Sequence, residues 1–189
     1  MDWSVPPAWR PRRPTSSDAV DECPRLLLSA CLLGQAVRYD GGHKHAPELV
    51  EALGRFAELI PLCPEAGAGL GIPRPPVDLH REGDRVRMCG VDDPAFDPTD
   101  ALTDWCRQQA ALLEAVGGCV LKARSPSCGI GSAPLHHPDG RETSTDGLFV
   151  AYVRANFPGL PMADEETLRD PVQLVGFREW VFSYAKREE

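Results

Sequence analysis

Three cysteines each follow a short apolar run, and thiolates are the side chains that best bind soft metal ions. The runs and the cysteines that follow them are residues 26–30 with Cys31, residues 58–62 with Cys63, and residues 119–121 with Cys128. If the runs are neighbouring parallel strands, their carboxyl ends share the sheet edge where open α/β sheets bind ligands. We therefore expect Cys31, Cys63 and Cys128 to converge on one metal centre.

The chemistry of three separate cysteines admits more than one interpretation. Thiolates bind zinc, Cu(I) and iron–sulfur clusters, and a closed zinc site usually has four ligands with close pairs such as C-x2-C, which this chain lacks. A [4Fe–4S] cluster on three protein thiolates would leave one iron open, and that iron could act as a Lewis acid on a substrate. Alternatively, each cysteine is simply a small buried hydrophobic residue.

Polar residues beside these cysteines offer further chemistry. Glu65 lies two positions after Cys63 and could move protons, or it could be an ordinary exposed loop acid. Ser125 and Ser127 could bind a ligand, or they could bond the local backbone of a turn. The cations Lys122 and Arg124 could offset the charge of a thiolate-rich cluster, or they could be a pair at the end of a strand that reaches solvent.

Strand and helix patterns alternate along the chain. Fully apolar runs predict buried parallel strands, and apolar spacing of three and four predicts helices. The predicted strands are 26–30, 59–62, 119–122 and 160–163, the predicted helices are 47–56, 100–116, 146–157 (capped by Asp146) and 168–185, and residues 85–89 are expected to form an edge strand or hairpin arm. Residues 130–146 are expected to be a polar loop. The fold class is therefore α/β, with a mostly parallel, Rossmann-like sheet flanked by helices.

Composition limits the class of protein. Residues 1–22 are rich in proline and arginine and predict a flexible tail, so that residues 23–189 form a single domain. A net charge of −8 disfavours a DNA-binding face. No apolar run approaches about 20 residues, and the start of the chain lacks a signal peptide, so we expect a cytoplasmic protein that does not enter a membrane. Seven cysteines without an export signal favour thiols or metal ligands over disulfides.

The remaining candidates for a metal site are weaker. Cys106 and Cys119 lie on predicted core faces and are expected to pack there, whereas Cys89 is the better candidate for a fourth ligand. The pairs His43/His45 and His136/His137 lie in polar loops without thiols or acids at ligand spacing, and we expect them to be solvated.

Five motifs, in order along residues 25–163, resemble the family known as domain of unknown function 523, whose characterised members are thiouracil desulfidases. The motifs are Ser29-Ala30-Cys31-Leu32-Leu33-Gly34, Arg38-Tyr39-Asp40-Gly41, Cys63-Pro64-Glu65, Gly69-Leu70-Gly71-Ile72-Pro73-Arg74-Pro75 and Lys122-Ala123-Arg124-Ser125-Pro126-Ser127-Cys128-Gly129. Where the family commonly shows Gly-x-Asp-Val-Thr, this chain has Gly90-Val91-Asp92-Asp93-Pro94 instead.

The resemblance implies a [4Fe–4S] cluster on Cys31, Cys63 and Cys128, and removal of sulfur from 2-thiouracil or a related thiolated pyrimidine to give uracil and sulfide. It implies that Glu65 transfers protons and that Ser125 is catalytic or binds substrate. We add Ser127, Lys122 and Arg74 as substrate-binding residues, and iron–sulfur assembly proteins as partners. Two alternatives stay open: a cluster-dependent enzyme that handles sulfur on tRNA, and a metal-binding sensor or structural protein.

Overall fold

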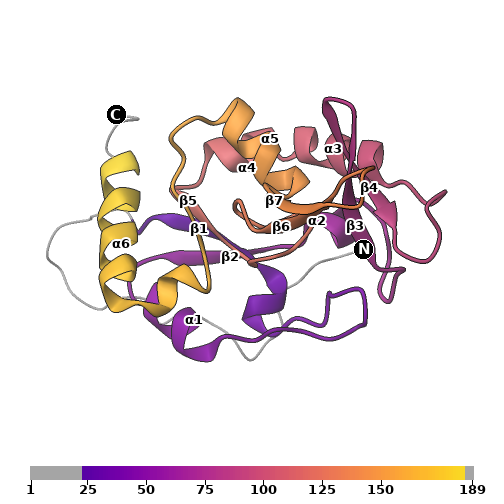
Figure 1. Ribbon diagram of the computed structural model, residues 1–189. Coiled ribbons are helices and arrows are strands. Elements are labelled where there is room, and N and C mark those ends of the chain that lie inside the picture. The colour runs from indigo at the N-terminus through magenta and orange to yellow at the C-terminus, as the bar shows by residue number, and fades with distance from the viewer. Residues whose placement is uncertain (1–22, 186–189) are drawn as a thin grey trace, which may run out of the picture.

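A four-stranded parallel sheet forms the centre of the molecule (Figure 1). The structure is a computed structural model that describes residues 23–185, so the predicted tail 1–22 and the last four residues lie outside the described part. The strands are β1 (Arg25–Ser29), β2 (Glu58–Leu62), β5 (Gly118–Leu121) and β8 (Met162–Asp164), in the order β2-β1-β5-β8. All three neighbouring pairs are parallel.

Helices cover both faces of this sheet because its strands are apolar on both sides. Leu26 and Leu28 face one cluster, and Leu27 faces the other. The first face is covered by η1 (Ala30–Leu33), α1 (Pro47–Gly54), η2 (Thr167–Arg169) and α6 (Pro171–Ala185), and the second by α3 (Thr99–Gln108), α4 (Ala110–Glu114) and α5 (Leu148–Asn156). The predicted α/β class with a parallel, helix-flanked sheet is confirmed.

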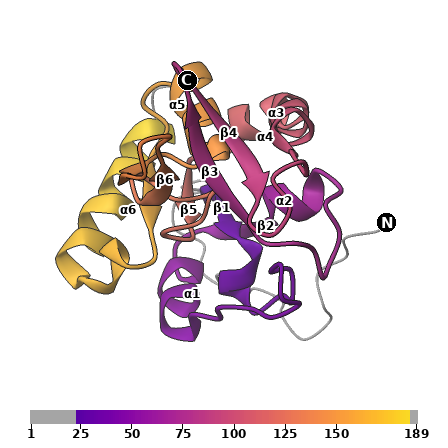
Figure 2. The same ribbon diagram turned by 45° about the vertical axis from the view of Figure 1, so that its right-hand side comes forward.

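A second sheet packs beside the first and was not expected. Its strands are β3 (Val77–Glu82), β4 (Arg85–Gly90), β6 (Ala133–His136) and β7 (Glu142–Thr145), in the order β4-β3-β6-β7. β3 and β4 form an antiparallel hairpin (Figure 2), as the predicted arm 85–89 suggests. The prediction of a polar loop over 130–146 is wrong, because β6 and β7 lie within it. Only Ala133 and Leu135 point into the core there, and two alternating residues are a weak strand signal.

Two predicted helices are interrupted. The helix predicted over 100–116 is divided at Gln109 into α3 and α4. The helix predicted over 168–185 is divided into η2 and α6, because Asp170 precedes Pro171 and adopts an extended conformation. Proline disfavours the helical conformation in the residue before it, so a new helix begins at Pro171.

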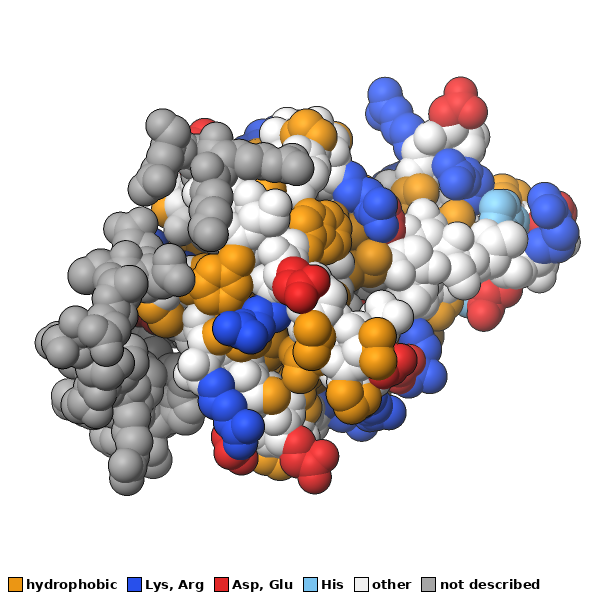
Figure 3. Space-filling model, turned by 90° about the vertical axis from the view of Figure 1, so that its left-hand side faces the viewer, with side chains coloured by type: hydrophobic (Ala, Val, Ile, Leu, Met, Phe, Trp, Pro, Cys, Tyr) orange, Lys and Arg blue, Asp and Glu red, His pale blue; other side chains and the backbone are white. Residues whose placement is uncertain are grey.

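Helix α6 forms the side of the molecule seen in Figure 3, where hydrophobic side chains lie among charged ones. Val172, Val175 and Trp180 are its exposed large hydrophobic residues, whereas Phe177 and Val181 are buried. Within residues 23–185, no helix combines the length and the apolar character needed to cross a bilayer.

Candidate functional site

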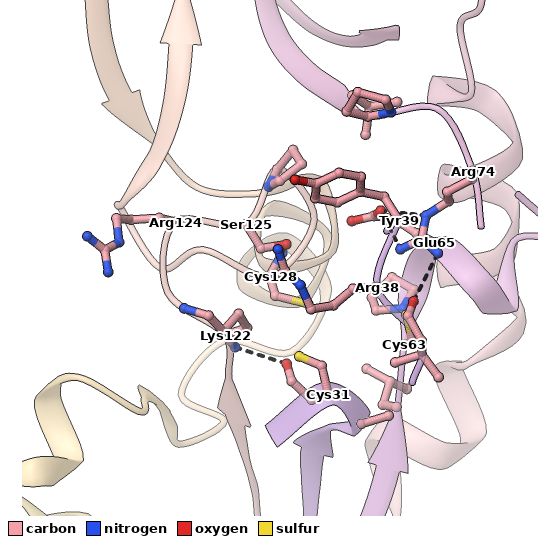
Figure 4. Close-up of a pocket in the computed structure, with 18 of the residues that line it drawn as sticks. Cys31, Arg38, Tyr39, Cys63, Glu65, Arg74, Lys122, Arg124, Ser125 and Cys128 are labelled. Carbon is pink, nitrogen blue, oxygen red and sulfur yellow. Dashed lines mark hydrogen bonds and ion pairs between the residues drawn. The ribbon is translucent and has the colours of Figure 1, made fainter. Parts of the chain in front are cut away.

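The three cysteines lie at the carboxyl ends of three adjacent strands. Cys31 lies in η1 directly after β1, Cys63 follows β2, and Cys128 lies in the loop that follows β5. Strand β1 lies between β2 and β5, so the chain crosses to opposite sides of it, which is where open α/β sheets form ligand sites. All three side chains line one cavity of about 280 Å³ (Figure 4). The structure thus brings these thiols together, and their role as ligands stays a prediction.

The thiols are strongly affected by burial and by one another. Burial and, to a smaller extent, the neighbouring Cys63 raise the pKa of the Cys31 thiol to about 11, although Arg38 and Lys122 act in the opposite direction. Burial also raises the pKa of Cys63 and, well above its usual value, that of Cys128, with Cys63 and Cys31 adding to the effect on Cys128. Thiols with raised pKa values are neutral near pH 7, so metal binding must displace their protons.

Glu65 is a buried carboxylate and not an exposed loop acid. It belongs to α2 (Pro64–Gly67), a single turn that Pro64 starts directly after Cys63. Its Oε2 accepts a hydrogen bond from Nε of Arg74 at 2.9 Å and forms an ion pair with Nη2 of Arg74 at 2.8 Å, and its Oε1 accepts a hydrogen bond from Ser127 Oγ at 2.8 Å. The carboxylate thus lines the cavity in one fixed orientation.

Two predicted substrate-binding residues therefore contact Glu65. Arg74 lines the cavity, but its guanidinium binds Glu65 and the carbonyl oxygens of Val37 and Gly71. Ser127 is fully buried behind Glu65 and is not among the residues that line the cavity.

Ser125 lines the cavity and also shapes the loop that carries Cys128. Its Oγ accepts hydrogen bonds from the backbone N–H groups of Ser127 and Cys128 at 3.2 and 3.1 Å. Both interpretations of this serine, ligand contact and turn formation, are therefore compatible with its position.

The same loop caps helix α5. The carbonyl oxygens of Pro126, Ser127 and Gly129 accept hydrogen bonds from the N–H groups of residues 148, 149 and 147, respectively. The prediction that Asp146 caps this helix is wrong, because these carbonyls satisfy the first-turn donors that a cap would bind. The Asp146 carboxylate instead accepts from the N–H of Gly131 and pairs with Arg154.

The two cations of the loop differ in their surroundings. The ammonium group of Lys122 lines the cavity and pairs with the buried carboxylate of Glu165. Arg124 pairs with Glu166, its side chain is mostly exposed, and it points away from the three cysteines (Figure 4).

Several residues that line the cavity had no predicted role. Arg38 reaches into the cavity beside Tyr39 (Figure 4), and Ser29 lines it from the end of β1. The glycines of the motif that contains Arg38 and Tyr39 predict a turn. That prediction gives no sign that the side chains of Arg38 and Tyr39 face the site.

A second cavity, of about 510 Å³, lies against the second sheet and contains different residues. Cys89, His80 and His136 line it, as do Gly90, Val91 and Pro94 from the segment that departs from the family pattern. Cys89 is thus not in the cavity of the other three cysteines. Cys106 and Cys119 are buried in the core, as expected.

Comparison with known proteins links this arrangement to a family. The uncharacterized protein YbbK of Bacillus subtilis (strain 168) is 26% identical over 151 residues, which cover 77% of this chain and 98% of YbbK. The solved structure of the [4Fe-4S]-dependent thiouracil desulfidase TudS is 28% identical, with a TM-score of 0.63, over 82% of this chain and 98% of that chain.

The family model described as 2-thiouracil desulfurase matches residues 26–165. That range contains all three cysteines and every strand of both sheets except the first residue of β1. The resemblance seen in the five motifs is thereby confirmed, and the chain belongs to the 2-thiouracil desulfurase family.

Proposed function

We propose that the protein is a [4Fe–4S]-dependent desulfidase that removes sulfur from 2-thiouracil or a related thiolated pyrimidine and releases uracil and sulfide. The observation that carries this proposal is the single cavity lined by two buried thiols, one half-buried thiol and one buried carboxylate. The structural relative TudS, described as [4Fe-4S]-dependent, supports the choice of cofactor and substrate.

The donor set fits a cluster better than a single ion. Within residues 23–185, no three side chains of His, Cys, Asp or Glu are grouped so that they could hold one metal ion. A cluster does not require this, because each thiolate binds a different iron atom. Cys31, Cys63 and Cys128 would hold three irons, and no other cysteine lines the part of the cavity that the structure describes.

When bound, the cluster supplies a Lewis acid that takes up soft sulfur and makes it a better leaving group. The side chains of this chain provide the rest. Glu65, aligned by Arg74 and Ser127, holds or transfers the proton at its Oε atoms as water replaces sulfur on the ring carbon. Ser125 Oγ, with its own proton still available, donates a hydrogen bond to the pyrimidine.

The alternatives are less well supported. A tRNA substrate is disfavoured by the net charge of −8. A sensor or structural protein would not need a carboxylate buried beside the thiols, since burying a charge is costly unless it has a use and partners.

The test is anaerobic reconstitution of the protein with iron and sulfide, followed by iron analysis and by sulfide release from 2-thiouracil. We expect close to four irons per chain, brown absorbance, and sulfide and uracil in equal amounts. Protein that loads a cluster but releases no sulfide from any thiolated pyrimidine would contradict the desulfidase, and protein that loads no cluster would contradict the cofactor.

A further inference from the structure

Glu165 is a buried carboxylate next to the candidate site, and the sequence analysis gave it no role. It lies directly after β8 and is 6% exposed. Its Oε2 accepts a hydrogen bond from the backbone N–H of Ala123 at 2.7 Å, and its Oε1 binds the ammonium group of Lys122. Carboxylates are rarely buried without a structural or chemical reason.

The position of Glu165 follows from the register of the sheet. Strands β5 and β8 are parallel, and Leu121 lies beside Asp164 as the last pair. The next residue of each strand therefore leaves the sheet at the same edge, which places Glu165 beside the start of the loop that leads to Cys128. Strand β8 is thus the fourth strand whose end contributes a side chain, that of Glu165, to this edge of the sheet.

Three consecutive backbone N–H groups at the start of that loop are held by side chains from other segments. The N–H of Lys122 donates to Ser29 Oγ at 2.9 Å, that of Ala123 donates to Glu165, and that of Arg124 donates to Ser132 Oγ at 3.0 Å. Only the middle acceptor is charged, and charge-assisted hydrogen bonds are the stronger kind. Arg124 has φ of 57°, a conformation that residues other than glycine seldom adopt, so this turn needs external support.

We propose that Glu165 is a positioning residue that fixes the course of residues 122–128 and thereby places Cys128 and Ser125 against Cys31 and Cys63. The proposal rests on the proposed function where it concerns the cluster. The placement of Cys128 itself can be measured without any cluster.

Glu165 also balances charge at the cavity. Lys122 lines the cavity that the three cysteines also line, and its ammonium group pairs with Glu165. With the pair intact, their net charge beside the thiols is zero. Removing the carboxylate alone would leave an unpaired, mostly buried ammonium group there.

The chain offers a matched control at the next position. Glu166 pairs with Arg124 of the same loop, but both side chains are largely exposed and Glu166 binds no backbone N–H of the loop. Exposed ion pairs contribute little to stability, so Glu166→Ala should leave the loop unchanged.

The experiment measures the rate at which iodoacetamide alkylates each cysteine in the apoprotein, by mass spectrometry. We expect Glu165→Ala to raise the rate at Cys128 about tenfold or more, because a hydrogen bond to a charged group contributes that much to holding a segment closed. The rates at Cys106 and Cys119 in the core should not change, and Glu166→Ala should match the wild type at every cysteine.

A second variant keeps the test decisive if Glu165→Ala does not fold. Glu165→Gln retains an oxygen for the Ala123 N–H but loses the charge that faces Lys122. Because a neutral acceptor makes a weaker hydrogen bond, we expect a rise in the alkylation rate at Cys128 that is smaller than in Glu165→Ala. We also expect a higher reduction potential of the reconstituted cluster, which the double variant Lys122→Met/Glu165→Gln should restore.

Wild-type alkylation at Cys128 in folded Glu165→Ala, or in Glu165→Gln where the alanine variant does not fold, would overturn the positioning role. An unchanged potential in Glu165→Gln would overturn the charge balance. If the wild type loads no cluster, the proposed function fails, whereas the alkylation rates still decide whether Glu165 positions the loop.

Discussion

Each of the two sheets of this protein lies beside a cavity. The two regions differ in how far their charged side chains are buried. In the cavity of the parallel sheet, Glu65 and Arg74 are buried and form a hydrogen-bonded ion pair. On the second sheet, His136 lies near Asp78 and Glu142 at 3.5 and 3.7 Å, and these side chains are a third or more exposed.

The difference supports the proposal that the functional site lies at the parallel sheet. Burying charge is costly, so the parallel sheet holds Glu65 and Glu165 in place by giving each of them partners. The second sheet leaves its polar residues in solvent, where they contribute solubility and weak pairs. Equivalent substitutions in the two cavities should therefore have very different effects, and the following predictions test that expectation.

The largest difference is expected between cysteines. Replacing Cys31, Cys63 or Cys128 with serine should abolish cluster loading, because each would hold a different iron, whereas Cys89→Ser in the second cavity should load normally. Iron analysis and visible absorbance after anaerobic reconstitution measure this. A Cys89→Ser protein without a cluster would show that the second sheet takes part in ligation.

A smaller difference is expected between two glutamates. Glu65→Gln should retain the cluster and lose turnover by roughly 10²–10⁴-fold, the usual contribution of acid–base catalysis. The control Glu82→Gln removes an exposed partner of Arg87 on the second sheet and should leave the turnover unchanged. Sulfide release per loaded cluster is the measurement, and full activity of Glu65→Gln would remove the acid–base role.

The close packing of Gly147 against the loop that carries Cys128 should affect the free energy of unfolding. A Cβ at Gly147 would lie 2.4 Å from the backbone carbon of Ser127, so Gly147→Ala should lower the free energy of unfolding by about 1–3 kcal/mol. Gly176→Ala in α6, where a Cβ would meet no atom within 4 Å, should be neutral or stabilising. Urea denaturation compares the two, and equal stabilities would mean that the loop yields easily.

The smallest effect is expected on the second sheet and depends on pH. Burial alone would raise the pKa of Asp97, but hydrogen bonds from Thr99 and the Arg87 guanidinium outweigh it and lower that pKa. The stabilisation is therefore present above the unfolded pKa near 3.9 and is lost as the pH falls through the folded value. Asp97→Asn should cost about 1–2 kcal/mol at pH 7 and progressively less below pH 4.

Urea denaturation of Asp97→Asn and wild type across that pH range measures the difference between them. The reconstituted cluster content should be the same in both proteins at neutral pH. A stability difference that persists unchanged at pH 2 would mean that the carboxylate charge is not its source.

The sequence was sufficient for the parallel sheet and insufficient for the second one. Runs such as 26–29 are apolar on both faces, and that pattern alone identifies a buried strand. Strand β7, in contrast, is Glu-Thr-Ser-Thr with no buried residue, so only its pairing with β6 makes it a strand. Local composition does not predict the pairing of segments that are distant in the sequence.

Within the site, strand-end residues could be located from the sequence, and their partners could not. That Arg74 and Ser127 hold Glu65 depends on a proline-rich segment and a loop 62 residues away meeting behind α2. The same strand-end rule applies to Glu165, but β8 has only three half-buried residues and therefore gives a weak strand signal.

The backbone of the Cys128 loop forms the N-terminal cap of α5, and this has a consequence for how the protein can change. Because Pro126, Ser127 and Gly129 each accept a hydrogen bond from that helix, inserting or deleting one residue there would shift the thiol and uncap the helix together. Length variation among relatives should therefore be absent from this turn and tolerated in the β3–β4 hairpin at Gly83, where an added Cβ would meet no atom within 4 Å.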